Sequence, residues 1–352
     1  MSATLGCGQK TGVRSGGRSR CQPNDAAPAA GGAVQNVRVT DDAFDEFSFL
    51  PAQAAELGAT GPIPAAERLT LALPDGRTLS ALRFGDAPPA VTFLHGAGLN
   101  AHTFDTTILA LGLPALSIDL AGHGDSSWRS DAAYTAGPLA DDVVRALEAW
   151  TTSPQTLVGQ SLGGLTAASV AARRPDLVAS LVIVDITPGV NPDEGPAQIR
   201  AFFAGPTSWA SRDELVERAL SFGLGGSRGA ATRGVYLNSR VREDGRVEWK
   251  HHFAHLAAAV ANGDADAPTL DSAVRDLLSE SGWHDLAAVT APITLIRGER
   301  GFVSAGDADD FSRRLPAASV VSVPARHNVQ EDIPAELAAL VRAASGRRSP
   351  AV

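Results

Sequence analysis

The residues best suited to chemistry form a short glycine-flanked run, Gly159-Gln160-Ser161-Leu162-Gly163, between an apolar stretch and an Ala-rich one. A G-x-S-x-G sequence between a strand and a helix is typical of a nucleophile elbow, a tight turn that exposes the serine hydroxyl. Small residues flank the turn because strand and helix approach closely there. The N–H of Leu162 would then lie beside the carbon that the serine attacks. The run therefore predicts nucleophilic catalysis by Ser161.

Two further runs supply the partners that such a serine requires. His327, just after the last predicted strand, is the candidate base that takes the serine proton and returns it to the leaving group. The glycine-rich run 95–98 ends an earlier strand, and the backbone N–H of Ala97 is the candidate oxyanion donor beside that of Leu162. We interpret His95 as a structural histidine that bonds nearby backbone.

Regular elements must bring these runs together. Short apolar runs bounded by turn residues predict eight strands, at 68–73, 78–84, 90–94, 115–119, 155–158, 181–185, 293–297 and 319–323. Pro74-Asp75-Gly76 predicts a hairpin between the first two strands. The later strands alternate with helical stretches such as 165–174 and 334–344, which indicates a mostly parallel α/β sheet.

The alternation stops between residues 187 and 290, where we expect helices and no β-strand. Helix-like patterns occur at 196–204, 212–222 and 272–279. A helical insert at the strand ends of an open sheet lies where ligands bind, so we interpret it as a cap. Its aromatic residues favour an apolar pocket wall, although packing between helix faces would also explain them: Phe202, Phe203, Trp209 and Phe222.

A histidine cluster in the same insert invites a metal-site hypothesis, because His251 and His255 have the spacing of one helix face. No glutamate with HExxH spacing and no cysteine accompanies them, so we reject that hypothesis. We expect the cluster, which includes His252, to line the pocket or to pack the cap.

Composition narrows the partners. The net charge of −9, from 30 basic and 39 acidic residues, argues against nucleic acid. The apolar runs are far shorter than the roughly 18 residues of a membrane span. Cys7 and Cys21 are the only cysteines, which excludes a disulfide framework and favours a cytoplasmic location.

Five runs in order make the chain from about residue 69 to 344 resemble the α/β-hydrolase superfamily, in particular capped single-domain bacterial serine hydrolases. They are HGAG at 95–98, DLAGHGDSS at 119–127, GQSLGG at 159–164, VDITPG at 184–189 and PARHNVQEDIP at 324–334. The resemblance implies an eight-stranded, mostly parallel sheet with the helical cap inserted after the sixth strand. It also implies that the loop 119–126 is mainly structural.

One piece of the family pattern is missing. The resemblance implies an acid in a G-x-x-D turn after the penultimate strand, where this chain has Gly301. Some relatives are similar in carrying the acid one strand earlier, where this chain has Asp185. We therefore favour Asp185 as the acid that orients His327, with Glu299 and Asp307 as alternatives. A carboxylate that caps the following turn is the structural alternative for Asp185.

These residues predict a serine hydrolase that cleaves a small ester or related acyl substrate through an acyl-enzyme. No metal or organic cofactor is required, and we expect a monomer or homodimer with no membrane partner. Alternatives are a carbon–carbon bond hydrolase, a haloperoxidase-like perhydrolase, or a non-catalytic receptor on the same fold. Arginines beside Ser161 would favour a dienoate substrate, and an apolar wall would favour simple esters.

The expected organisation has six segments. It comprises a disordered leader at 1–35, an extension packing on the core at 36–66, the first part of the core at 67–186, the cap at 187–290, the second part of the core at 291–346 and a flexible end at 347–352.

Overall fold

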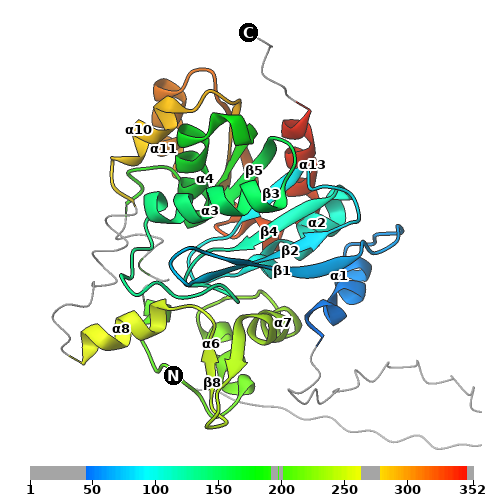
Figure 1. Cartoon of the computed structure of the whole chain (residues 1–352), viewed down its shortest axis with the longest axis vertical. Coiled ribbons are helices and arrows are strands. Elements are labelled where there is room, and N and C mark those ends of the chain that lie inside the picture. Colours follow the sequence, from blue (N-terminus) through cyan, green and yellow to red (C-terminus); the bar gives the residue numbers. More distant parts are fainter. Residues whose placement is uncertain (1–44, 192–196, 198–200, 263–277, 347–352) are drawn as a thin grey trace, which may run out of the picture. The chain divides into compact units, whose positions relative to one another are not determined.

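A mixed sheet organises the chain. The computed structural model describes residues 45–191, 197, 201–262 and 278–346, so the expected leader and flexible end lie outside the described residues. The sheet has the order β1-β2-β4-β3-β5-β6-β9-β10, and Figure 1 labels its strands β1 to β5. Its strands are β1 (Ala66–Ala72), β2 (Thr78–Phe84), β3 (Val91–Leu94), β4 (Ala115–Asp119), β5 (Gln155–Gln160), β6 (Val178–Val184), β9 (Ile293–Arg300) and β10 (Ser319–Arg326).

The predicted eight-stranded, mostly parallel sheet is confirmed. Strand β2 is antiparallel to both β1 and β4, and all other neighbours are parallel. Several strands run two or three residues beyond their predicted ends, because the backbone ladder continues where the apolar pattern stops. In β10, for example, pairing resumes after a bulge at Arg326, which lies opposite Arg300.

Helices cover both faces of the sheet, and the sheet separates the hydrophobic core into two clusters. Alternate residues of β6 separate the faces, with Leu181 and Ile183 in one cluster and Val182 and Val184 in the other. The first cluster contains side chains of α3 (Ala136–Trp150), α4 (Leu162–Arg173), α10 (Gly282–Ala288) and α11 (Ala305–Arg314); the second contains those of α1 (Leu50–Glu56), α2 (Asp105–Leu111) and α13 (Pro334–Ser345). Short helical turns complete the core: η2 (Glu46–Phe49), η3 (Ala101–Phe104), η4 (Pro175–Leu177) and α12 (Val329–Asp332).

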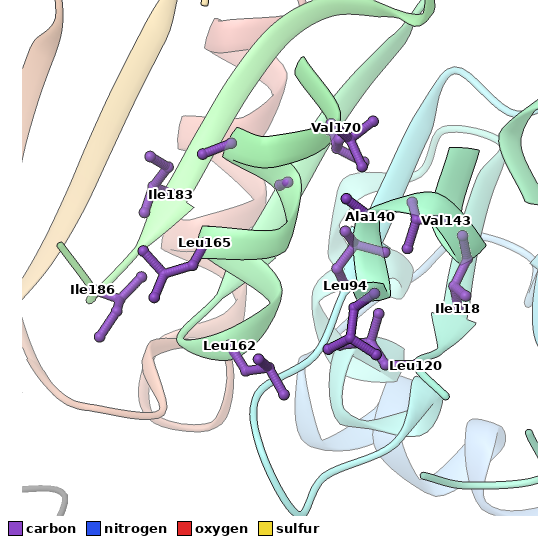
Figure 2. Packing of buried hydrophobic residues seen from close by; sticks show 14 of the residues in the cluster. Leu94, Ile118, Leu120, Ala140, Val143, Leu162, Leu165, Val170, Ile183 and Ile186 are labelled. Atoms are coloured by element: carbon purple, nitrogen blue, oxygen red, sulfur yellow. The ribbon is translucent and has the colours of Figure 1, made fainter. Parts of the chain in front are cut away.

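Helix α4 packs directly against the centre of the sheet. Its apolar side chains Leu162, Leu165 and Val170 lie among those of β3, β4, β6 and α3 (Figure 2). Ten of the twelve residues of α4 are buried, and small residues dominate it. A helix of this composition can approach the strands closely, so its first turn is held firmly in place.

The cap contains a feature that the sequence did not predict. The expectation of helices without β-strands between residues 187 and 290 was wrong, because β7 (Ser239–Val241) and β8 (Val247–Trp249) form an antiparallel hairpin. Each strand has three residues, which is too short for a recognisable alternating run. Its turn is closed by a hydrogen bond from Arg242 N to Arg246 O (2.8 Å).

The cap helices are α6 (Arg212–Ser221), α7 (Arg228–Asn238) and α8 (Phe253–Ala261), which lie together on one side of the sheet in Figure 1. Helix α6 confirms the helix predicted at 212–222. Most of the helix predicted at 272–279 lies outside the described residues, as do 196 and 198–200 of the one predicted at 196–204.

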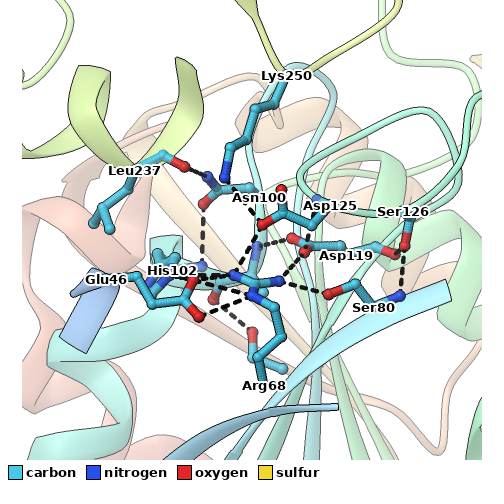
Figure 3. A network of polar contacts seen from close by, with 12 residues as sticks. Glu46, Arg68, Ser80, Asn100, His102, Asp119, Asp125, Ser126, Leu237 and Lys250 are labelled. Carbon is cyan, nitrogen blue, oxygen red and sulfur yellow. Dashed lines mark hydrogen bonds and ion pairs between the residues drawn. The ribbon is translucent and has the colours of Figure 1, made fainter. Parts of the chain in front are cut away.

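A polar network joins the segment before the sheet to the core (Figure 3). Arg68 forms ion pairs with Glu46 and with Asp119 (2.8 Å to the latter), and Asp119 also accepts from Ala101 N (2.7 Å). Asp119 begins the run 119–127, and its role here is structural, as expected. The network fixes the start of η3 beside the loop 95–98.

His102 is the titratable centre of this network. Its Nδ1 lies 2.9 Å from Asp105 Oδ2, and its Nε2 lies 3.1 Å from Glu46 Oε2. Burial disfavours the charged ring, but the two carboxylates outweigh it and raise the pKa of His102 to about 9. His102 is therefore an imidazolium at neutral pH.

A pH-dependent loss of stability follows. Because the pKa of His102 is higher in the folded than in the unfolded protein, its protonation stabilises the fold. This stabilisation is complete at pH values below the unfolded-state pKa near 6.5, and it is lost as the pH rises through 9. We expect His102→Gln to lower the free energy of unfolding by roughly 2–3 kcal/mol at pH 6 and by much less at pH 10. Urea unfolding of both proteins at the two pH values measures this difference. His284→Gln, on an exposed side chain of α10, is the control, and a pH-independent effect of His102→Gln would contradict the assignment.

Candidate active site

Ser161 lies at the sharp turn between β5 and α4. Its φ of 53° and ψ of −121° are unusual for a residue with a side chain, and the strain amounts to about 1–3 kcal/mol. Hydrogen bonds hold the turn, from Ser161 N to Val184 O (3.1 Å) and from Gly164 N to Ser161 O (2.8 Å). The geometry is that of the predicted elbow.

Close backbone packing explains the glycines on either side. A Cβ added at Gly163 would collide with the backbone of Leu94 and His95 at the end of β3. One added at Gly159 would collide with the backbone of Gly163 itself. Strand, turn and helix can therefore meet only with glycine at both positions.

His327 and Asp185 are brought into contact, although 142 residues separate them. His327 Nδ1 lies 2.8 Å from Asp185 Oδ2, and the carboxylate is fully buried. The ring of Phe302 stacks on the imidazole, with centroids 3.4 Å apart and planes 11° apart. The ring plane is thus fixed, and the second ring nitrogen, Nε2, is left for another partner.

Backbone donors hold the Asp185 carboxylate. Oδ1 accepts from Gly298 N (2.9 Å) and Oδ2 accepts from Phe302 N (2.7 Å) in addition to the imidazole. A Cβ added at Gly301 would lie within the space that this carboxylate occupies. The carboxylate from β6 thus fills the place beside the turn after β9 where the family pattern has its own acid.

The other two acid candidates lie elsewhere. Asp307 forms a capping box with Ser304 at the start of α11, with Asp307 N to Ser304 Oγ at 3.1 Å. Glu299 is exposed near the end of β9. Neither forms a contact with His327.

The two candidate oxyanion donors lie on adjacent loops. Ala97 lies in the turn after β3, which is closed by Leu99 N to Gly96 O (3.2 Å), and Leu162 is the first residue of α4. Neither amide donates to another residue in the part of the chain that the structure describes. Both are therefore available to a ligand oxygen.

His95 has the structural role expected of it. Its Nε2 accepts from Leu120 N (3.0 Å), so its Nδ1 carries the proton and donates to Gly96 O (2.8 Å). Burial lowers the pKa of His95 to about 4. The ring is neutral and ties β4 to the loop 95–98.

Ser161 and His327 face one cavity of about 360 Å³. Its wall is largely apolar, as the aromatic residues of the cap suggested, and includes Leu99, Phe202, Phe203, Phe222, Leu224 and Phe302. Trp209 does not line it and packs inside the cap instead. Arg218 supports the wall from behind, since its guanidinium lies over the rings of Phe202 and Phe222 and donates to Ala204 O (3.1 Å).

The cap histidines pack the cap onto the core and do not line this cavity. His251 precedes α8, so it does not share a helix face with His255. It is fully buried, and burial together with nearby His123 lowers its pKa well below the usual value. His252 bonds Tyr134 (2.8 Å) and stacks on Trp128.

Two further features concern the described residues only. No group of three or more His, Cys, Asp or Glu side chains among them could hold a metal ion. None of their helices is long and apolar enough to cross a membrane.

Sequence reasoning missed several residues around Ser161 and His327. Gln160 Nε2 lies 3.3 Å from His327 O and 3.4 Å from Asn328 Oδ1, which ties the elbow to the histidine loop. Phe302 and Glu331 also line the cavity. Adjacency to Ser161 is a signal that could have singled out Gln160, whereas the stacking of Phe302 depends on a fold-level contact.

Comparisons with known proteins agree with this architecture. The family model for the alpha/beta hydrolase fold matches residues 89–223. The chain is 35% identical to "Esterase Rv0045c" of Mycobacterium tuberculosis over 85% of this chain and 95% of that protein. It is 30% identical to "sn-1-specific diacylglycerol lipase ABHD11" of Mus musculus over 71% of this chain and 79% of that one. A crystal structure of the mycobacterial esterase covers 87% of this chain and 98% of its own, with a TM-score of 0.70.

The contact between Gly301 and Asp185 generates a test. We expect Gly301→Ala to push the carboxylate away from His327, to lower the free energy of unfolding by about 1–3 kcal/mol and to lower kcat/KM for an ester at least ~10-fold. Gly306→Ala, on α11 with no close neighbour, is the matched control and should retain activity. Steady-state hydrolysis and urea unfolding measure both. Full activity in Gly301→Ala would show that the carboxylate is not confined as described.

Proposed function

The chain belongs to the alpha/beta hydrolase fold family and is a serine esterase, and on that premise we propose that Ser161, His327 and Asp185 form its catalytic triad. The observation that carries the proposal is the Asp185–His327 hydrogen bond beside a cavity that also holds a strained serine. A buried carboxylate that orients an imidazole, together with a serine that lines the same cavity, has the composition of a Ser-His-Asp triad.

The proposed reaction begins with the substrate carbonyl above Ser161. Ser161 Oγ attacks the carbonyl carbon, and its proton passes to Nε2 of His327, the nitrogen that Asp185 leaves free. Asp185 stabilises the imidazolium that forms and holds its ring in place. His327 then protonates the leaving alcohol, and the acyl group stays on Ser161. Water, deprotonated by the same imidazole, attacks the acyl-enzyme and releases the acid.

Two backbone amides are proposed to stabilise the tetrahedral intermediates. Neither the N–H of Ala97 nor that of Leu162 donates to another described residue; Leu162 directly follows Ser161, and Ala97 lines the same cavity as the serine. Leu162 is also the first residue of α4, so the positive end of that helix favours the oxyanion. Each such donor contributes about 2.7–4 kcal/mol to barrier lowering in comparable enzymes.

The cavity favours small esters without a carboxylate over dienoate-like carboxylates. Arg326 lines the cavity, but its guanidinium is bound to the Asp332 carboxylate (2.6 Å and 3.1 Å). It therefore lacks the free face that a substrate carboxylate would need. No observation on the described residues favours the carbon–carbon hydrolase or the perhydrolase hypothesis. The receptor hypothesis does not explain the strained backbone of Ser161.

We propose that the esterase works in the cytoplasm. We also propose that it is a monomer or homodimer and needs no cofactor. The net charge of −9 and the two cysteines support this, together with a small-molecule substrate and no nucleic-acid or membrane partner.

Triad variants test the proposal. With p-nitrophenyl esters from acetate to octanoate, we expect wild-type protein to show a burst followed by turnover. Ser161→Ala should lose both, and Asp185→Asn should lower kcat by about 10⁴-fold because the imidazole loses its orienting charge. Circular dichroism verifies folding, and a fluorophosphonate probe should label Ser161 in the wild type.

The alternative acids provide the controls. Glu299→Gln and Asp307→Asn should keep near-normal turnover, with Asp307→Asn losing only about 1 kcal/mol of stability from the α11 cap. Normal turnover by folded Asp185→Asn would overturn the role of Asp185. An unlabelled serine and no hydrolysis of any acyl length would overturn the esterase mechanism.

A further inference from the structure

A second cavity of about 380 Å³ adjoins the reaction cavity. The two share five lining residues: Gly98, Leu99, Phe202, Leu224 and Glu331. A substrate bound at Ser161 can therefore extend past these residues into the second space. The groups at this junction decide which chemical group is accepted there.

Glu331 is the charged residue at the junction. The backbone N–H of Glu331 donates to Asn328 O (2.9 Å), in the helical turn that follows His327. The side chain of Asn328 also donates, through Nδ2, to Glu331 Oε1 (3.2 Å). No described residue donates to its other oxygen. The side chain is exposed and lines both cavities, and desolvation by the cavity walls raises its pKa.

The cations around the two cavities are already paired. Among the described lining residues, Arg326 is bound to Asp332, and Arg233 lies 3.2 Å from both oxygens of Glu56. The imidazolium of His102 lies between Asp105 and Glu46. Glu331 is thus the lining carboxylate that forms no ion pair in the described part of the chain.

An aromatic ring lies at the same junction. Phe202 lines both cavities, and Phe222, with its centroid 5.4 Å away, lines the reaction cavity. The faces of such rings attract organic cations, as the Arg218 guanidinium over both rings illustrates. A carboxylate and phenyl rings together form the surroundings that suit an ammonium group.

We propose that the junction of Glu331 and Phe202 binds an ammonium group carried by the ester substrate, an inference that rests on the proposed esterase function. The chemistry of the reaction supports it. A carboxylate that lines the reaction cavity without an ion pair repels the negative charge that develops in the transition state, and a cationic substrate offsets this repulsion. The junction therefore selects cationic esters over neutral ones of the same shape, and it selects against anionic ones.

The test compares two esters that differ only in charge, butyrylcholine and its uncharged isostere 3,3-dimethylbutyl butyrate. We expect wild-type kcat/KM to favour the choline ester by about tenfold. Glu331→Gln, which retains the acceptor for Asn328, should abolish most of that preference while hydrolysis of the neutral ester changes less than about twofold. Tetramethylammonium should inhibit the wild type competitively and the variant more weakly. Glu336→Gln, exposed on α13 outside both cavities, is the matched control and should keep the wild-type preference.

The outcomes separate this inference from the function on which it rests. Equal kcat/KM for the two esters in the wild type, or an unchanged preference in Glu331→Gln, would overturn the ammonium site. A parallel loss for both esters in Glu331→Gln would also overturn it, because it would show that Glu331 only positions Asn328 and His327. If Ser161-dependent hydrolysis of the neutral ester persists in any of these cases, the esterase mechanism stands. If neither ester is hydrolysed and Ser161 is not labelled, the proposed function itself fails.

Discussion

The Asp185 carboxylate ties together the segments that follow three neighbouring strands of the sheet, β6, β9 and β10. Asp185 directly follows β6. Its carboxylate accepts from Gly298 N in β9 and from Phe302 N just after β9, and it contacts His327, which follows β10. A buried carboxylate without such donors would be strongly destabilising, so the turn after β9 must supply them. The absence of a side chain at Gly301 leaves the room that the carboxylate fills. The position of the histidine loop and the stacking of Phe302 on His327 both depend on this arrangement.

The cap is attached to the same machinery through the loop after β3. Asn238, at the end of α7, donates to Gly98 O (2.7 Å), and Asn100 donates back to Leu237 O (2.8 Å). On the other side, Lys250 pairs with Asp125 (2.9 Å), as Figure 3 shows. The loop that carries the Ala97 amide is therefore held between core and cap. The position of the cap and the geometry of the loop around Ala97 are mechanically linked.

The sequence predicts local structure well and long-range contacts poorly. The elbow at Ser161, the loop 95–98 and eight strands all follow from patterns within a few residues. The choice of Asp185 depended on a family resemblance, because nothing local relates it to a histidine 142 residues away. The β7–β8 hairpin was missed because three-residue strands carry no recognisable period. The ionic environment of Glu331 could not be inferred either, since its neighbours Arg233 and Phe202 come from the cap.

Two residues at the ends of neighbouring strands have strained backbone conformations. Ser161 and Asp185 both adopt positive φ, 53° and 51°, which is costly for residues with a Cβ. Each is held by a hydrogen bond to the next strand, Ser161 N to Val184 O and Asp185 N to Ile296 O (2.8 Å). The two strained residues are thus anchored one strand apart, at the same edge of the parallel sheet. Because the sheet and α4 enforce both conformations, Ser161 and Asp185 are held in position before any substrate binds.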